Sequence, residues 1–457
     1  MDLVTRGFGD SPTPKAFTTV AWSDAKASVI DDLYRLGCRN LRPAAYKRVV
    51  DDMRARDTLE SNSGWPLFTR RNKPEVVASS IADAESGKWK EYPAIALFRN
   101  YNLKTRMVWM FPMSANIVEG SYFQVIQSAI IKGNARFVAP WIGFEQVRQM
   151  VSFAYNDLND LWFLSASDFS ETDEHFKLFA TREVADVLES CFQRPFRAGL
   201  RESLEHMNTI PLVISTDSKV VGGHGVSSGS NWTNFVETIF DWILSYYVGI
   251  NTSGPDTDFR AFEKWTDANP TDIYVPNSRL HQGFYAIGDD MTWVSGRYDP
   301  KFAERLERLG KSVGMQIKAD KTTNDQDKVK SLQRLFIRGY SRPDGQVRAV
   351  YPTIRALKSS IYPERFHKPE LWSSDMFCAR QYMILENCVD HPLFEEFVKF
   401  VVKGQKDLIP FSKKSAGALD RILRETKLLP GLNPTYNQER RDTSLASFAS
   451  IDIARRL

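Results

Sequence analysis

The sequence predicts an α+β fold in which a central antiparallel sheet is backed by helices and flanked by irregular and helical ends. Strand-like and helix-like patterns alternate through the middle third of the 457-residue chain. Two of the strand patterns there are joined by a short Gly/Asp turn, and the chain after Val350 is mostly helical by pattern. A chain of this length usually exceeds what one hydrophobic core supports, so we expect several subdomains.

Composition is that of a soluble globular protein, with 42% hydrophobic and 25% charged residues and a net charge of +4. Such a charge permits a nucleic-acid partner without requiring one. Four cysteines show no CxxC spacing, so neither a disulfide framework nor a zinc site is indicated. The N-terminus has no apolar signal-peptide region, and the most apolar stretch, Trp232 to Ile250, carries Glu237 and Asp241 and is a poor membrane span. We therefore expect a reduced, cytosolic setting and no membrane partner.

Acidic residues lie at the ends of the predicted strands in the middle third. The apolar run Leu161–Ser167 predicts a buried strand that ends at Asp168. Strand-like runs Phe284–Ile287 and Met291–Val294 flank Gly288-Asp289-Asp290, which predicts a tight hairpin. A strand-terminal Asp beside a hairpin Asp forms a two-carboxylate clamp of the kind that suits Mg²⁺. Asp168 alone could simply cap the next turn, but its pairing with the hairpin favours the metal interpretation.

A loop rich in glycine and serine, residues 221–230, precedes a long predicted helix. The helix has one continuous apolar face, made of Trp232, Phe235, Val236, Ile239, Phe240, Ile243 and Leu244. The opposite face carries polar residues, which either face water or face a ligand. Glycines allow close backbone approach, and a helix N-terminus favours anions, so the loop favours a nucleotide-facing role.

Three basic residues are candidates for phosphate chemistry. Lys104 and Arg106 lie two apart in a strand-like segment, so both side chains point to the same side and suit a triphosphate. Lys321 follows a predicted helix whose apolar face includes Phe302 and Leu306. A lysine there could protonate a leaving pyrophosphate, although the residues alone favour a solvated loop lysine.

Taken in order, these motifs resemble those of viral RNA-dependent RNA polymerases, closest to the picobirnavirus and partitivirus group with double-stranded RNA genomes. The resemblance runs from about residue 61 to residue 340. It implies that Ser63, Gly64 and Pro66 belong to a template-guiding motif of the fingers. It implies that Lys104 and Arg106 grip the incoming NTP.

The resemblance also assigns the acids. Asp168 is implied to bind metal together with Asp289 and Asp290, while Asp173 helps to sense the ribose 2′-hydroxyl. Lys321 falls where the family places its general acid. The implied cofactor is a pair of Mg²⁺ ions, with Mn²⁺ as an alternative.

The loop and helix resemble the family's sugar-selecting motif, which implies that Ser228, Gly229 and Thr233 contact the nucleotide. The sequence departs from the pattern at one point. Positive-strand enzymes carry Asn four residues after the motif Thr, whereas this chain has Glu237 there and Asn234 directly after Thr233. Both Asn234 and Glu237 are therefore candidates for the ribose network.

The implied architecture is a right hand of fingers, palm and thumb, closed by fingertips, with Arg338 in a primer-grip hairpin. The expected boundaries are an N-terminal fingertip region (1–60), fingers (61–160), first palm part (161–190), fingers insertion (191–211), second palm part (212–345), and thumb with C-terminal tail (346–457). We expect the polar tail beyond Leu429 to fold back toward the product channel and help position initiation.

The implied function is RNA-directed RNA synthesis, replicating and transcribing a viral double-stranded RNA genome by two-metal nucleotidyl transfer. Template RNA, nascent RNA and NTPs are the expected partners, with a viral capsid protein as a further one. We expect a monomer in the virion interior or the host cytoplasm. A reverse transcriptase is one alternative, but those enzymes usually carry an aromatic where Asp173 lies. A non-enzymatic RNA-binding or capsid-associated protein is the other.

Overall fold

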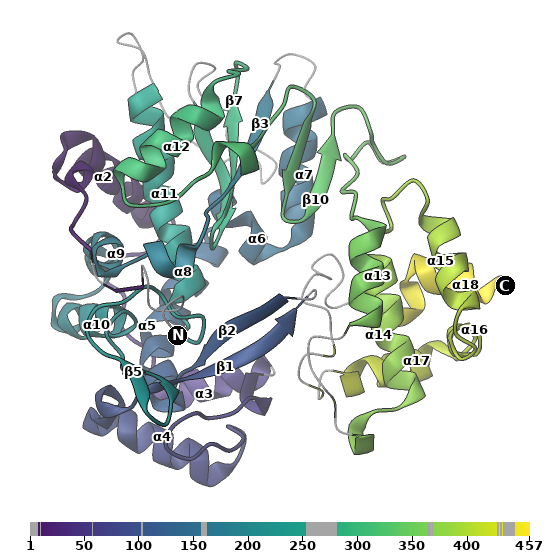
Figure 1. Ribbon diagram of the computed structural model, residues 1–457, viewed down its shortest axis with the longest axis horizontal. Coiled ribbons are helices and arrows are strands. Elements are labelled where there is room, and N and C mark those ends of the chain that lie inside the picture. Colours follow the sequence, from purple (N-terminus) through teal and green to yellow (C-terminus); the bar gives the residue numbers. More distant parts are fainter. Residues whose placement is uncertain are drawn as a thin grey trace. The chain divides into compact units, whose positions relative to one another are not determined.

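The computed structural model describes residues 8–9, 11–56, 58–101, 104–156, 162–252, 281–362, 367, 369–426, 429, 432 and 444–457. The chain divides into two compact units (Figure 1). The first unit comprises Met1–Leu97, Val108–Ile142 and Gln149–Leu332, and the second comprises Phe98–Met107, Gly143–Arg148 and Gln333–Leu457.

The first unit contains the predicted antiparallel sheet. Its strand order is β6 (Gln282–Ile287), β7 (Asp290–Ser295), β3 (Phe163–Asp168) and β8 (Thr323–Asn324). Both neighbours of β3 run antiparallel to it, as β6 does to β7. Ala286 of β6 and Met291 and Trp293 of β7 share a hydrophobic core with helix α11 (Thr233–Thr252), which packs against β6 and against α2 (Val20–Arg35). The prediction of a central antiparallel sheet backed by helices is confirmed.

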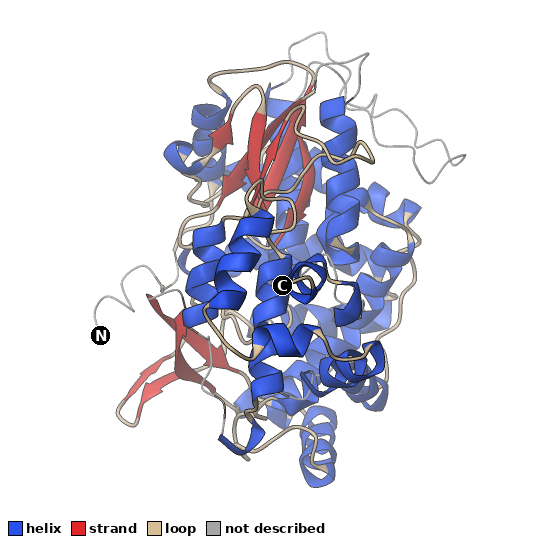
Figure 2. Ribbon diagram, turned by 90° about the vertical axis from the view of Figure 1, so that its right-hand side faces the viewer, coloured by secondary structure: helices blue, strands red, loops and turns tan. Residues whose placement is uncertain are grey.

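A second sheet has the order β2 (Lys104–Met110), β1 (Ala94–Tyr101), β4 (Leu212–Ser215) and β5 (Ser218–Val220). Figure 2 shows the strands of the two sheets as separate groups. Strand β4 pairs in parallel with β1, with Leu212 opposite Ala94, so this sheet mixes parallel and antiparallel pairs.

Helices make up most of the remaining structure. In the chain before the hairpin they are α3 (Tyr46–Ala55), α4 (Pro74–Ser86), α5 (Met113–Lys132), α6 (Ala139–Ile142), α7 (Phe144–Asn156), α8 (Thr172–His175), α9 (Leu178–Cys191) and α10 (Arg194–His206). After the hairpin come α12 (Phe302–Ser312), α13 (Thr353–Ile361), α14 (Ser374–Glu386), α15 (Phe394–Lys403), α16 (Leu408–Ser412), α17 (Ala416–Thr426) and α18 (Ala449–Arg455). Within the described ranges, no helix is both long and apolar enough to cross a membrane.

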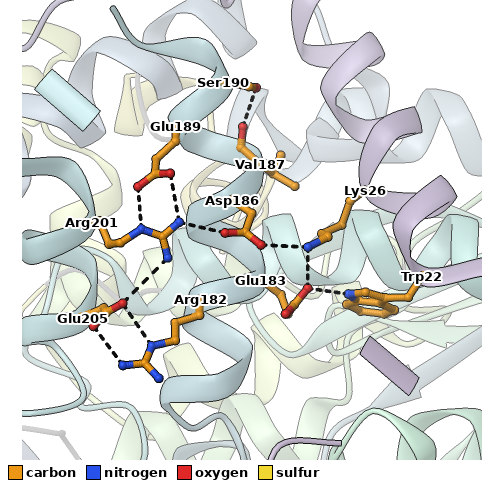
Figure 3. Close-up of polar contacts among 10 residues, drawn as sticks. All are labelled: Trp22, Lys26, Arg182, Glu183, Asp186, Val187, Glu189, Ser190, Arg201 and Glu205. Atoms are coloured by element: carbon orange, nitrogen blue, oxygen red, sulfur yellow. Dashed lines mark hydrogen bonds and ion pairs between the residues drawn. The ribbon is translucent and has the colours of Figure 1, made fainter. Parts of the chain in front are cut away.

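Ion pairs join α2, α9 and α10 within the first unit (Figure 3). Lys26 of α2 lies 2.7 Å from Glu183 and 2.9 Å from Asp186, both on α9. Arg201 of α10 lies 2.8 Å from Asp186 and 2.6 Å from Glu189. Because Asp186 contacts cations from two helices, the pairs form one network and fix the three helices side by side.

The C-terminal residues are part of the core of the second unit. Leu445, Phe448 and Ile451 are each at most 1% exposed and pack with side chains of α14 and α15. The expectation of a polar tail beyond Leu429 is therefore wrong for residues 444–457, because every third or fourth residue there is apolar and buried. The part of that tail between residues 433 and 443 lies outside the described residues.

Candidate active site

The predicted strand-end Asp and hairpin acids meet at one end of the first sheet. Asp168 is the direct partner of Asp290 in the antiparallel ladder of β3 and β7. Ile287 pairs with Asp290 and closes a two-residue turn, Gly288-Asp289. The Phe169 amide donates to the Asp289 carbonyl at 3.4 Å. Acids far apart in the sequence are thus neighbours in the fold, with Asp168 and Asp289 exposed and Asp290 half-buried.

Helix α11 supports the hairpin turn from below. The Gly288 amide donates to Thr238 Oγ1 at 2.8 Å. A Cβ at position 288 would lie 2.7 Å from Asn234 Nδ2 and 3.3 Å from Glu237 Oε2, and the φ of Gly288 is +59°. Only glycine fits this turn without displacing α11. Sequence reasoning missed Thr238, because a threonine inside an apolar helix gives no signal of its own.

Two acids of α11 are buried beneath the turn. Glu237 is 7% exposed and Asp241 is 0% exposed. Burial, and then the charge of Asp289, raises the pKa of each carboxyl well above its ordinary value, with Asp173 acting further on Glu237 and Asp290 on Asp241. Neither oxygen of Asp241 has a hydrogen-bond partner among the residues that the structure describes. Glu237 and Asp241, on the polar side of this helix, therefore lie beneath the hairpin and not in water.

This excess of negative charge fits a site for divalent cations. A cation beside Asp289 would relieve the repulsion that raises the pKa values of Glu237 and Asp241. Across the described part of the chain, no three His, Cys, Asp or Glu side chains are gathered as a ready-made metal cage. Mg²⁺ needs no such cage, since it is usually held by one or two carboxylates together with phosphate oxygens and water.

Lys321 is brought to the end of β3 by backbone pairing. Phe169 forms a bridge with Ile317, and the Ser170 amide donates to the Gln316 carbonyl at 2.7 Å. The short 3-10 turn Ala319–Lys321 follows, and Lys321 Nζ donates to Ser170 Oγ at 3.2 Å. The lysine therefore lies beside the acidic end of the sheet. It contacts Ser170, which is two residues after Asp168 in the chain.

Asp173 lies in α8, directly after β3, and is exposed. The glycine loop closes against it, since a Cβ on Gly225 would lie 1.7 Å from the Asp173 carbonyl oxygen. Thr172 Oγ1 is 3.5 Å from Asp289 Oδ2. The segment after β3 is thus held between the hairpin and the glycine loop.

The glycine loop meets the protein's own backbone as well. A Cβ on Gly229 would lie 2.0 Å from the Trp109 carbonyl oxygen, and the Trp109 amide donates to Ser228 Oγ at 3.4 Å. Thr233 Oγ1 donates to the Ser227 carbonyl at 2.7 Å, and Trp141 Nε1 donates to Asn234 Oδ1 at 3.3 Å. The glycines predicted to approach a ligand are needed for internal packing, while Ser228 and Asn234 remain exposed.

The predicted template motif forms a tight loop of the first unit. The Ser63 amide donates to the Thr69 carbonyl at 2.7 Å, and the Met113 amide donates to the Ser63 carbonyl at 2.8 Å. Gly64 has a φ of +71°, and a Cβ there would lie 2.5 Å from the Phe111 carbonyl oxygen. Ser63 and Gly64 are consequently buried at the base, and Pro66 is exposed at the tip.

Three predicted residues belong to the second unit, whereas the site above is built from the first unit alone. Lys104 and Arg106 lie on β2, so their strand is confirmed, but their side chains lie outside the described residues. Arg338 is half-buried and follows β10 (Arg334–Ile337), whose Leu335 pairs with Val350.

A strand-end Asp paired with a Gly-Asp-Asp turn, with a lysine alongside, is an arrangement that suits metal-dependent phosphoryl transfer. The family model of viral RNA-dependent RNA polymerase matches residues 102–362. The chain therefore belongs to the viral RNA-dependent RNA polymerases. It is an RNA-directed RNA polymerase, and hence a nucleotidyltransferase, of the picobirnavirus-like kind.

Similar proteins agree with this assignment. A potential RNA-dependent RNA polymerase of Human picobirnavirus (strain Human/Thailand/Hy005102/-) is 27% identical over 408 residues, covering 82% of this chain and 68% of that protein. The crystal structure of the RNA-dependent RNA polymerase of a human picobirnavirus has the same fold, with a TM-score of 0.71 and 21% identity over 97% of this chain and 80% of that one. Its insertion loop deletion mutant matches with a TM-score of 0.68 and 23% identity over 92% of this chain and 77% of that one. The family implies an RNA template, NTP substrates and divalent metal ions.

Proposed function

We propose that Asp168 and Asp289 hold the two Mg²⁺ ions of RNA synthesis, with Mn²⁺ as an alternative, and that Asp290 supports them. The observation that carries this proposal is the pairing of Asp168 with Asp290 across adjacent antiparallel strands, next to the turn that presents Asp289. The buried acids of α11 support it, because the charge of Asp289 adds to the effect of burial in raising the pKa of both carboxyls.

When bound, the divalent ions orient the RNA 3′-hydroxyl and the NTP and neutralise the charge that develops on the phosphates. The carboxylates of Asp168 and Asp289 supply the fixed negative ligands. Lys321, which donates to Ser170 beside them, supplies the proton to the leaving pyrophosphate. Strands β3 and β7 keep these groups in register, so little reorganisation is needed during the reaction.

The ribose of the incoming nucleotide is recognised by Asp173 with the loop residues Ser228, Gly229 and Thr233. Glu237, more than Asn234, completes this network. Glu237 lies in the field of Asp173, and its raised pKa favours a protonated carboxyl that can donate a hydrogen bond. Asn234 already accepts a hydrogen bond from Trp141 and lies against Gly288.

The RNA and triphosphate contacts follow the family resemblance. Lys104 and Arg106 bind the triphosphate, Arg338 supports the primer end, and the loop of Ser63, Gly64 and Pro66 guides the template. The hand then comprises fingertips (1–60), fingers (61–160 and 191–211), palm (161–190 and 212–345) and thumb (346–457). The enzyme replicates and transcribes a double-stranded RNA genome as a monomer with template and nascent RNA, in the virion interior with capsid protein or in the host cytoplasm.

The test of the metal-holding pair is template-directed NTP incorporation by Asp168→Asn and Asp289→Asn. Each variant should lose activity by roughly 10³-fold, since a fixed anionic ligand is removed at constant size. RNA binding measured in EDTA should be unchanged. The matched control is Asp217→Asn, an exposed acid in the turn between β4 and β5. Full activity in both site variants would refute the proposal.

The test of sugar recognition compares incorporation of ATP and dATP opposite a template uridine. Asp173→Ala should reduce the preference for ATP about tenfold or more, because a hydrogen bond to the ribose hydroxyl is lost. Glu237→Gln should retain part of the preference, since the amide can still donate. An unchanged ATP preference in Asp173→Ala would remove its role, and an effect of Asn234→Ala larger than that of Glu237→Ala would reverse the assignment between those two residues.

A further inference from the structure

Helix α5 carries a buried acid that the proposed mechanism does not use. Glu119 is 1% exposed, and Asn116, one turn earlier, is also 1% exposed. Asn116 Nδ2 donates to Glu119 Oε2 at 2.9 Å, so the two side chains form a single polar group inside an otherwise apolar helix environment. Burial of a carboxyl and an amide is costly unless hydrogen bonds compensate, so their partners show what this group holds.

The partners are Gly229 and Ser230 of the glycine loop and Asn231, which directly follows it. Ser230 Oγ donates to Glu119 Oε1 at 2.6 Å, and the Asn231 amide donates to Glu119 Oε2 at 2.8 Å. Asn116 Nδ2 donates to the Gly229 carbonyl at 3.1 Å, and Asn231 Nδ2 donates to the Asn116 carbonyl at 3.0 Å. Four hydrogen bonds from one helix face thus fix the loop immediately after Ser228 and immediately before α11.

The opposite side of the loop is fixed by sterics. Gly229 lies so close to the Trp109 carbonyl that a Cβ would approach it to 2.0 Å. The loop is therefore held between the backbone of β2 on one side and Glu119 with Asn116 on the other. If the hydrogen bonds to α5 are lost, the loop keeps, of its described contacts with β2, the steric contact at Gly229 and the long 3.4 Å hydrogen bond from the Trp109 amide to Ser228 Oγ, so it can move away from β2.

Asn116 also contacts the loop around Ser63, which holds the predicted template motif. Arg71 Nη2 donates to Asn116 Oδ1 at 2.8 Å, and Arg71 Nε donates to the Asn62 carbonyl at 2.9 Å. Asn116 therefore receives a donor from the loop around Ser63 and gives one to Gly229. Arg71 is also the charged residue that acts on Glu119, where it opposes the effect of burial.

We propose that Glu119, with Asn116, is a positioning residue that holds Ser228 and Gly229 in the geometry needed to read the ribose of the incoming nucleotide. The inference rests on the proposed sugar-selecting role of that loop. Glu119 contacts no substrate in this proposal. It acts through Ser230 and Asn231, and the ionised carboxylate is the form that accepts all three donors.

Ionisation of Glu119 supplies a signature that a purely structural residue lacks. Burial raises the pKa of Glu119 to about 7, and the donors Ser230, Asn116 and Asn231 and the charge of Arg71 counteract part of that shift. Protonation removes an acceptor site from the group, so the loop should loosen as the pH falls through about 7. The KM for NTP should then rise on the acid side in the wild type and stay flat in Glu119→Gln.

The experiment measures kcat and KM for ATP and dATP on a primed RNA template with Glu119→Gln, Ser230→Ala and the double variant. Each single variant should raise the KM for ATP about tenfold, with a smaller change in kcat, and should lower the ATP preference, because a hydrogen bond to a charged group is lost. The double variant should be no worse than the worse single variant, since both remove the same contact. Ser121→Ala is the matched control, because Ser121 is a buried α5 residue that donates to the Val118 carbonyl and does not contact the loop.

Several outcomes separate this inference from the proposed function. Ser228→Ala and Thr233→Ala are measured alongside. If they change the ATP preference while Glu119→Gln and Ser230→Ala do not, the positioning role is overturned and the sugar-selecting loop stands. If none of the four changes it, the sugar-selecting assignment fails and this inference fails with it. Should Glu119→Gln not fold, Ser230→Ala decides, since it removes the 2.6 Å bond to Glu119 together with the 3.1 Å bond that Ser230 Oγ accepts from the Trp232 amide.

Discussion

The two units of the molecule bury acidic side chains in opposite ways. In the second unit Asp390 is 1% exposed and lies among arginines. Arg342 contacts it through Nε at 2.6 Å, Arg148 through Nη2 at 3.1 Å, and Arg348 through Nη1 at 3.8 Å. In the first unit the groups that act on buried Glu237 are Asp289, Asp173 and Asp241, all of them acids.

The difference separates an acid that stabilises the fold from acids that are set up for a ligand. Asp390 joins segments that are distant in the chain, and its charge is balanced within the second unit. Glu237 and Asp241 place two more carboxyls beneath a turn that already carries Asp289 and Asp290, and no cation among the described residues counteracts the rise in the pKa of either one. A fold does not gain stability from such crowding, so its benefit must come from what binds there.

The largest effect expected from this contrast is on stability. Asp390→Asn should lower the free energy of unfolding by about 3–5 kcal/mol, because the buried guanidinium of Arg148 loses its buried counter-ion, whereas the carboxylate of Glu145 that it also contacts is exposed. Chemical denaturation of the full chain measures the loss.

Asp241→Asn is the matched comparison, since it makes the same isosteric change at another fully buried acid. It should cost less than about 1 kcal/mol without divalent ions, because it removes a charge that burial already disfavours. Equal losses of unfolding free energy in the two variants would show that pairing with arginines does not set Asp390 apart from Asp241.

An intermediate case is Asp32 of α2, which is held mainly by neutral donors. Tyr246 Oη donates to it at 2.5 Å and Trp242 Nε1 donates at 3.2 Å. Burial raises its pKa from 3.8 to about 6, although both donors and Arg35 counteract the shift. Between these two values the folded state binds more protons than the unfolded state, so the stabilisation that Asp32 contributes is greatest below about pH 4 and is lost as the pH rises through 6.

The expected contribution is on the order of 2–3 kcal/mol, since each pKa unit corresponds to about 1.4 kcal/mol. The contribution of Asp32 is measured by comparing the unfolding free energies of the wild type and Asp32→Asn from pH 4 to pH 8. The variant should gain relative to the wild type as the pH rises. A constant difference across that range would mean that the Asp32 pKa is not raised by folding.

The sequence was sufficient to predict the first sheet and its acids because local pattern and tertiary role coincide there. Phe284–Ile287 and Met291–Val294 are strand formers on both sides of a turn that only Gly288 fits, and β3 ends at Asp168 as expected. The helix of Leu306 likewise forms with its apolar face buried.

Other parts could not be predicted, because their environment is made by distant segments. Helix α5 is buried over its first ten residues, including Ser114 and Glu119, so it has no polar stripe to reveal its period. The parallel pairing of β1 with β4 joins segments more than a hundred residues apart. The composition around Ile451 is that of a polar tail, and it hides a short amphipathic helix, α18. Glu119 gave no signal, since its loop partners become visible only once the chain is folded.

The smallest effect should come from the ion pairs among α2, α9 and α10, which lie at the surface. The Arg201 side chain is 33% exposed, so water screens its contacts with Asp186 and Glu189. Arg201→Met should lower the free energy of unfolding by about 1 kcal/mol or less, and the loss should shrink in high salt. The loss from Asp390→Asn should change little with salt, because that acid is sealed from solvent. Chemical denaturation at low and high ionic strength measures the losses in both variants. A salt-independent loss of several kcal/mol in Arg201→Met would show that burial does not distinguish these two kinds of ion pair.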